Sequence, residues 1–263
     1  AAVSSVLLNT IDRYSLNYLA DLDAVGTYTL AFRISNTIKV VIITSIQLSL
    51  IPILFKKIGD PDLNRFISKS MNYSTLVVMF FVLCVSIFSM EITKTFAHTM
   101  SYWEAYHIIP ILSFSMVFVM MKENVLIGLQ ITKSSKTMGS LIAITAVFNL
   151  ALNMILIPRF VLFGAAASTL ISQAVMFGLF YFIAQKKYPV SYEIKNLIKL
   201  FITGVILFLL SVLSNNWNIL PRMTYKLGLL GAFPLLIYLF RFFEPIETQR
   251  LKEFYRKYKH MVI

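Results

Sequence analysis

Cysteine, histidine and acidic residues are scarce in this chain of 263 residues. The sequence holds one cysteine, three histidines and 12 Asp and Glu residues, against 24 Lys and Arg residues. A single cysteine excludes a disulfide framework and a thiolate metal site. Cys84 lies in the apolar run 76–88, where it is expected to pack as a small apolar side chain.

Motifs for covalent chemistry are missing as well. The sequence has no nucleophile elbow and no glycine-rich phosphate loop, and the three histidines do not have the spacing of a metal site. We therefore expect no catalytic residue, no bound metal and no cofactor. An enzyme acting on lipid-linked sugars is disfavoured, because clustered carboxylates and metal motifs are lacking.

Apolar residues dominate what is present. They make up 58% of the chain, and the mean hydropathy is +0.75, more than a water-soluble domain of this length can bury in one core. About 20 apolar residues span a hydrocarbon layer of roughly 30 Å. Suitable segments run approximately over 2–20, 27–55, 66–90, 105–132, 137–157, 164–184, 197–214 and 225–243. The sequence predicts an all-α membrane protein with about eight transmembrane helices in the lipid bilayer.

Basic residues gather in alternate loops. One set of loops, with the C-terminal tail, holds fifteen: Lys56, Lys57, Arg65, Lys69, Lys133, Lys136, Lys186, Lys187, Lys195, Lys199, Arg250, Lys252, Arg256, Lys257 and Lys259. The other set holds four: Lys94, Arg159, Arg222 and Lys226. Cytoplasmic loops carry the excess of Lys and Arg. We therefore predict that both ends of this chain face the cytoplasm and that the net charge of +12 reflects membrane topology, not binding of nucleic acid.

The last segment, 244–263, has a different pattern. Leu251, Phe254 and Tyr258 recur at helical spacing opposite basic residues. This pattern predicts a basic amphipathic helix on the anionic lipid surface, with a solvated tail as the alternative.

Polar side chains interrupt several predicted membrane helices. They form stripes with Asn9, Asp12 and Arg13 on the first helix; Arg33, Asn36, Thr37, Thr44 and Gln47 on the second; Ser115, Lys122, Glu123 and Gln130 on the fourth; and Thr145, Asn149 and Asn153 on the fifth. For the amides, hydrogen bonds between helices are the favoured explanation.

Charge in these stripes is unbalanced. Arg13, Arg33, Lys39 and Lys122 outnumber the carboxylates Asp12 and Glu123, although Lys39 falls off its stripe and could snorkel. Buried cations in excess are costly without an anionic partner. We predict a cavity for a negatively charged substrate lined by Arg13, Arg33, Lys122, Asn36, Gln47 and Asn9. Asp12 and Glu123 are candidates for coupling to protons or sodium, or for pairing with their adjacent cations.

Several passages are similar to those of a known family. They are NTIDRY at 9–14, LADLDAVGTYTLAFRIS at 19–35, YWEAY at 102–106, IPIL at 109–112, LIP at 156–158 and GAAASTLIS at 164–172. In this order they resemble the second lobe of polysaccharide flippases in the multidrug/oligosaccharidyl-lipid/polysaccharide exporter superfamily. The chain departs from the family at Val161, where relatives often have glycine, and it lacks the first lobe.

The resemblance implies a function and a division of the chain. Residues 1–190 would form the second six-helix lobe, 191–243 two additional helices and 244–263 the cytoplasmic tail. Such flippases carry an undecaprenyl-diphosphate-linked oligosaccharide repeat unit across the bacterial cytoplasmic membrane by alternating access, for surface polysaccharide or O-antigen synthesis. Expected partners are the N-terminal lobe of the same protein and polysaccharide polymerase machinery. In the family, charge at positions matching Asp12, Arg13 and Arg33 faces the cavity.

Two other functions remain open. A cation-coupled drug exporter of the same superfamily would favour carboxylates and aromatic surfaces in its cavity. A non-transporting membrane scaffold would use the polar stripes only to hold helices together.

Overall fold

The computed structural model describes residues 2–97, 99–240 and 242, with side chains from Ile11 onward. The described chain is helical and contains no strand. It divides into two compact units, Ala1–Ile194 and Lys195–Ile263, which are considered separately. The basic helix predicted at 244–263 lies outside the described residues.

Helices occupy all eight predicted apolar segments. They are α1 (Ala2–Leu19), α2 (Leu22–Thr37) continued by the π-helix η1 (Ile38–Ile43) and α3 (Thr44–Lys56), α4 (Leu63–Ile87), α6 (Ala105–Ile131), α7 (Ser135–Lys187), α8 (Ile194–Val212) and α9 (Ile219–Leu239). The short helices α5 (Ser89–Phe96) and η2 (Met100–Glu104) were not predicted. The all-helical class is therefore confirmed.

Among the described residues, five helices are long and apolar enough to cross a membrane. They are Leu22–Lys56, Leu63–Ile87, Met100–Ile131, Ser135–Lys187 and Ile194–Val212. Their length and composition indicate a membrane protein.

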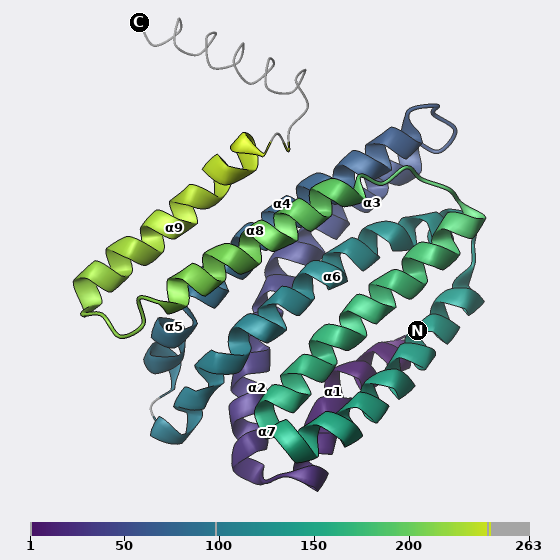
Figure 1. Cartoon of the computed structure of the whole chain (residues 1–263). Coiled ribbons are helices and arrows are strands. Elements are labelled where there is room, and N and C mark those ends of the chain that lie inside the picture. Colours follow the sequence, from purple (N-terminus) through teal and green to yellow (C-terminus); the bar gives the residue numbers. More distant parts are fainter. Residues whose placement is uncertain (1, 98, 241, 243–263) are drawn as a thin grey trace, which may run out of the picture. The chain divides into compact units, whose positions relative to one another are not determined.

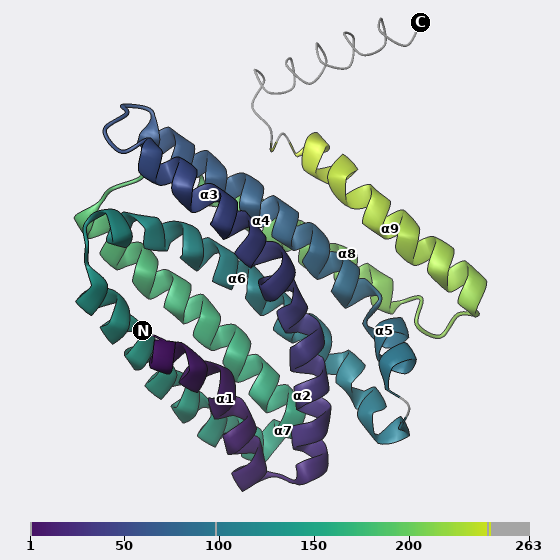
Figure 2. The ribbon, with the colours of Figure 1, turned by 180° about the vertical axis from the view of Figure 1, so that it is seen from behind.

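The longest of these helices, α7, consists of two limbs that meet at Val161 (Figures 1 and 2). A straight helix of 53 residues would be about 80 Å long, far more than a bilayer requires. At Val161 the backbone has φ 43° and ψ −110°, a strained conformation for a β-branched residue. Its two limbs match the separate segments predicted at 137–157 and 164–184.

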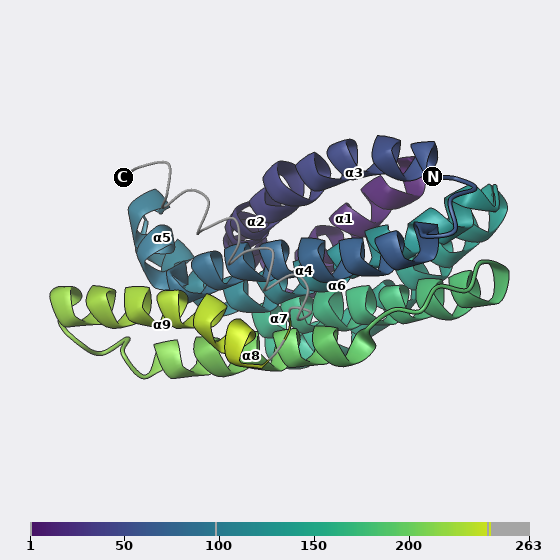
Figure 3. The ribbon, with the colours of Figure 1, turned by 90° about the horizontal axis from the view of Figure 1, so that it is seen from above.

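In the unit Ala1–Ile194, α6 forms the centre. It is mostly buried and packs against α2, α4 and α7, while α1 packs on α7 (Figure 3). The core joins Leu16 and Tyr28 to Ile109, Ile157 and Ala165. Because most residues of α6 are buried, the helix needs no solvent-facing stripe.

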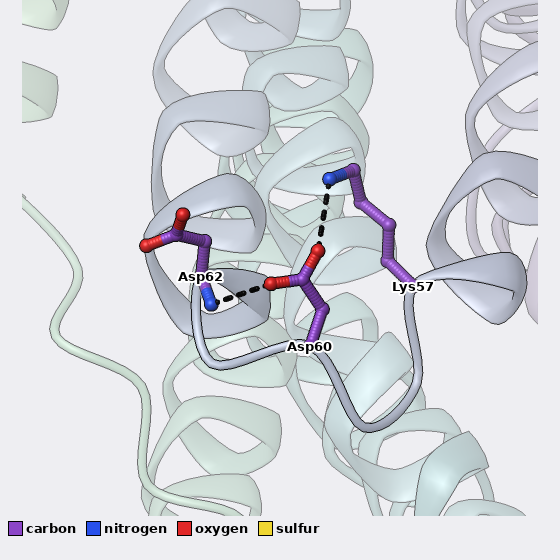
Figure 4. A network of polar contacts seen from close by, with 3 residues as sticks. All are labelled: Lys57, Asp60 and Asp62. Atoms are coloured by element: carbon purple, nitrogen blue, oxygen red, sulfur yellow. Dashed lines mark hydrogen bonds and ion pairs between the residues drawn. The ribbon is translucent and has the colours of Figure 1, made fainter.

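A tight turn joins α3 to α4 (Figure 4). Asp60 accepts a hydrogen bond from the backbone N–H of Asp62 at 2.9 Å and forms an ion pair with Lys57 at 3.3 Å. The backbone hydrogen bond, followed by Lys57, lowers the pKa of the Asp60 carboxyl. Gly59, at φ 96°, supplies the left-handed residue that the turn requires.

The lowered pKa of Asp60 predicts an acid-sensitive turn. A carboxyl whose pKa is lower in the folded state than in the unfolded chain stabilises the folded state at pH values above its unfolded pKa of about 3.9. This contribution disappears as the pH falls through the folded pKa. We expect an NMR titration of Asp60 to give a midpoint below 3.9. In Lys57→Gln the midpoint should rise only partly, since the Asp62 N–H remains. A midpoint at or above 3.9 in the unchanged chain would contradict this geometry.

The unit Lys195–Ile263 contributes α8 and α9 to the described structure. In their connection the Trp217 and Tyr225 ring centroids lie 5.2 Å apart, and Arg222 donates to the Asn215 carbonyl at 3.3 Å.

Candidate functional site

A buried carboxylate, Asp12, lies where α1 meets α2 and both limbs of α7. Its side chain is 2% exposed. One oxygen accepts hydrogen bonds from the Tyr28 hydroxyl at 2.8 Å and the Thr169 hydroxyl at 2.7 Å. The other oxygen accepts from the Asn153 amide at 2.8 Å. These three donors come from α2 and from the two limbs of α7, so Asp12 joins segments that are distant in the sequence.

Further polar groups surround this carboxylate. Asn153 accepts a hydrogen bond from Ser168 and donates to Asn149 at 3.4 Å. We call Asp12, Tyr28, Asn149, Asn153, Ser168 and Thr169 the Asp12 cluster. All six residues are buried. The five neighbours of Asp12 in the cluster are neutral. The Asp12 cluster therefore offers one carboxylate among polar groups, an arrangement suited to a proton or a small hard cation.

The adjacent cation, Arg13, does not neutralise Asp12. Its guanidinium carbon lies 4.9 Å from the centroid of the Phe32 ring, a cation–π contact. In the part of the chain that the structure describes, Arg13 forms no ion pair with Asp12, and its Nε atom is buried without a hydrogen-bond partner. The alternative in which Asp12 merely pairs with Arg13 is therefore not what the structure shows.

A second set of charged side chains lies on η1 and α6. The Lys122 ammonium forms an ion pair with Glu123 at 2.6 Å, and Lys39 interacts electrostatically with both residues. The side chains of Lys122 and Glu123 are mostly buried. Glu123 thus compensates the charge of one of the two lysines, Lys39 and Lys122.

The π-helix η1 changes the predicted polar stripe of the second helix. A π-helix has i to i+5 hydrogen bonds, so residues after Thr37 no longer follow the α-helical spacing on which the stripe was predicted. Arg33 and Thr44 are exposed, Asn36 is half-buried and Gln47 is buried with its amide nitrogen lacking a partner. The stripe is therefore divided, and Lys39, predicted to fall off it, lies with Lys122.

The predicted cavity residues are only partly brought together. Across the described residues, Arg33 has no ion pair or side-chain hydrogen bond, and Arg13, Arg33 and Lys122 make no direct contact with one another. The side chain of Asn9 lies outside the described residues. Glu123 pairs with the adjacent Lys122, as the structural alternative predicted.

Three members of the Asp12 cluster, Tyr28, Ser168 and Thr169, were not predicted from the sequence. Each carries a hydroxyl in an apolar stretch, a pattern too common to single out. Asn149 and Asn153 were recognised as a polar face, but their partner, 141 residues from Asn153 in sequence, could not be identified without the fold.

A cavity of about 640 Å³ lies at the end of the unit where α1 turns into α2. Carboxylates of Asp21, Asp23 and Glu104 line it, together with the rings of Phe160 and Phe163. Asp21 also caps α2 by accepting from the Ala24 N–H at 2.7 Å. Carboxylates beside aromatic rings suit an organic cation.

No protein-family model and no curated protein matches this sequence. Among the described residues, no group of three or more His, Cys, Asp or Glu side chains could hold a metal ion. The Asp12 cluster, with one carboxylate and several neutral oxygen atoms, suits a small cation.

Proposed function

We propose that this chain is the second lobe of a two-lobe flippase and crosses the membrane eight times, with both ends in the cytoplasm of a bacterium. Its substrate is an undecaprenyl-diphosphate-linked oligosaccharide repeat unit, which it moves to the outer leaflet for surface polysaccharide or O-antigen synthesis. The first lobe of the same protein completes the cavity, and polymerase machinery receives the product. No covalent chemistry is involved.

An excess of positive charge in the apolar helices carries the proposal. Lys39 and Lys122 share one carboxylate, Glu123, and Arg33 adds an exposed cation in the apolar span Leu22–Lys56. Uncompensated cations at membrane depth are expensive and mark pathways for anionic ligands. A diphosphate supplies the missing negative charge, while Asn36 and Thr44 offer hydrogen bonds to sugars.

The Asp12 cluster supplies a means of coupling. Asp12 holds α1, α2 and the two limbs of α7 together through its oxygens. Loss of its negative charge, through a proton or a bound sodium ion, changes all three hydrogen bonds at once. In this mechanism the change alters the packing of α1 and α2, so that the lobes alternate between inward and outward access.

Removal of the two lysines tests this function. In cells that depend on this protein, Lys39→Gln with Lys122→Gln is expected to lower surface polysaccharide at least tenfold, with lipid-linked repeat units accumulating in the inner leaflet. Each lost ion contact to a diphosphate is worth about 1.5–3 kcal/mol, so two lost contacts suffice for this effect. Surface polysaccharide is measured by immunoblot and lipid-linked units by mass spectrometry.

A matched control comes from the α6–α7 loop. Lys133→Gln with Lys136→Gln removes the same charge from exposed positions and should leave surface polysaccharide unchanged. Normal polysaccharide in the Lys39/Lys122 variant, at equal protein level, would contradict a role in anion binding and support a scaffold.

One observation favours a second candidate, a cation-coupled drug exporter. The cavity of about 640 Å³, where Asp21, Asp23 and Glu104 lie beside the rings of Phe160 and Phe163, suits an organic cation. An exporter would lower cellular accumulation of cationic dyes, whereas a flippase would leave dye accumulation unchanged.

A further inference from the structure

The helices α3 and α4 run side by side (Figure 2). An open groove of about 490 Å³ lies between them. Its walls are Ile46, Leu50, Phe66, Tyr73 and Val77. Lys69 to Val77 on α4 covers about 12 Å of helix length. In a membrane protein, an apolar hollow of this length suits a hydrocarbon chain.

Small residues of α4 give the groove its depth without offering polar groups to a ligand. Ser70 donates to the Asn124 side-chain oxygen at 3.3 Å, and the Asn124 amide donates to Ser74 at 3.0 Å. Asn124 is fully buried on α6. Because these partners lie beneath the groove, its floor is satisfied internally and needs no water.

Cations stand at the mouth of the groove. The Lys57 ammonium lies 5.4 Å from the centroid of the Phe66 ring, and Phe66 is itself a wall of the groove. The ion pair between Lys57 and Asp60 is exposed and so contributes little to stability (Figure 4). Lys57 is therefore able to bind another anion. Lys69, also on the wall, is held by Glu193 at 2.7 Å.

The whole of this end of the unit is basic. Segment 188–193 is tied to α4, since Ser68 donates to the Ser191 carbonyl at 2.7 Å and Asn72 to Glu193 at 2.7 Å. Lys187 donates to Ser134 at 2.8 Å and so brings in the α6–α7 loop. We call the cations gathered here the basic rim: Lys56, Lys57, Arg65, Lys69, Lys133, Lys136, Lys186 and Lys187. These eight cations face three carboxylates, Asp60, Asp62 and Glu193, so the rim attracts anions.

We propose that the α3–α4 groove is a binding site for an anionic phospholipid, with one acyl chain between Phe66 and Val77 and the phosphate at Lys56 and Lys57. A hydrocarbon chain matches the apolar walls, and a negative headgroup matches the rim. The site does not depend on the transport function proposed above, because it uses none of the residues assigned to the substrate or to coupling.

A tryptophan placed in the groove tests the proposal on the full chain. Val77 is 42% exposed, so Val77→Trp adds a fluorophore at the inner end of the groove without filling the core. Brominated phosphatidylglycerol in vesicles should quench this tryptophan at about one tenth of the concentration that brominated phosphatidylcholine needs. The fluorescence of Trp103 and Trp217 is measured in the parent chain and subtracted from that of the Val77→Trp variant.

Charge variants separate a site from general attraction. On the Val77→Trp background, Lys56→Gln with Lys57→Gln should abolish the roughly tenfold preference for the anionic lipid, since a direct contact of an ammonium with the bound phosphate contributes about tenfold. Lys133→Gln with Lys136→Gln removes equal charge from the same rim away from the groove and should change the preference less than twofold. Equal losses in both double variants, or equal quenching by both lipids, would overturn the proposal.

A second measurement needs no substitution. Native mass spectrometry of the parent chain, purified in mild detergent, should show one retained anionic phospholipid, lost in the Lys56/Lys57 variant. Retention of a polyprenyl diphosphate instead, or cross-linking of the groove to a second protein chain, would assign a different occupant and overturn the proposal.

Discussion

Replacement of Asp12 by asparagine is expected to reduce transport to background while leaving the protein folded. The amide has almost the same volume as the carboxyl but carries no charge and presents an N–H group where Asp12 now accepts hydrogen bonds from Tyr28, Thr169 and Asn153. One donor then faces another donor in a buried site, which costs about 1–3 kcal/mol of stability. A proton or sodium ion loses its only charged ligand in the cluster.

Two other variants separate the loss of charge at Asp12 from a loss of folding. Asp12→Ala leaves the Tyr28 hydroxyl and the Asn153 amide with a lost acceptor and adds a cavity, so it should destabilise by about 3–5 kcal/mol and lower the amount of folded protein. Asp23→Asn removes an exposed charge in the first turn of α2 and should change stability by less than about 0.5 kcal/mol.

Surface polysaccharide in cells and thermal unfolding in detergent are the two readouts. The predicted pattern is lost polysaccharide with a folded Asp12→Asn protein, and normal polysaccharide with Asp23→Asn. Full transport by Asp12→Asn would show that the negative charge has a structural role only.

Gly164→Ala is expected to destabilise the protein by about 3 kcal/mol or more. A Cβ atom at this position would lie 2.3 Å from the Leu156 carbonyl oxygen and 2.9 Å from the Ile157 nitrogen. Both are backbone atoms of the opposite limb of α7, so no side chain can move aside to admit the methyl group. The two limbs must separate, and Ser168 and Asn153, which join them at the Asp12 cluster, separate with them.

Two glycines in the same helix serve as controls. Gly139→Ala and Gly178→Ala meet nothing within 4 Å, and alanine is favoured over glycine in a helix by about 1 kcal/mol. Both should unfold at the same or higher temperature, whereas Gly164→Ala should unfold well below the parent. Equal unfolding temperatures for all three variants would contradict the close approach of the limbs at Gly164.

Apolar segments of about 20 residues predicted the positions of the long helices, since hydrophobic length is a local property of the sequence. The division of α7 was also predictable: Pro158 and Arg159 interrupt an apolar stretch too long for one crossing. The strained conformation of Val161 was not, because a β-branched residue is the least expected one at a positive φ. Glycine would adopt it without strain.

Side-chain pairing was harder to predict than helix position. The stripe on the second helix assumed a constant 100° per residue, and six π-helical residues at Ile38–Ile43 broke that spacing and left Gln47 buried. Asp12 was selected as an ionisable group in an apolar helix, which needs only local sequence. Its partner Thr169 is 157 residues away, and only the packing of α1 on α7 brings the two together.

The most direct test of the proposed function is movement of the lipid-linked substrate between leaflets. The proposed two-lobe protein would be reconstituted into vesicles carrying an undecaprenyl-diphosphate-linked oligosaccharide in the inner leaflet, and exposure of the sugar would be followed with a membrane-impermeant glycosidase. We predict protein-dependent exposure that is lost in Asp12→Asn and in Lys39→Gln with Lys122→Gln. Exposure at the same rate in protein-free vesicles, or no loss in these variants, would contradict the account.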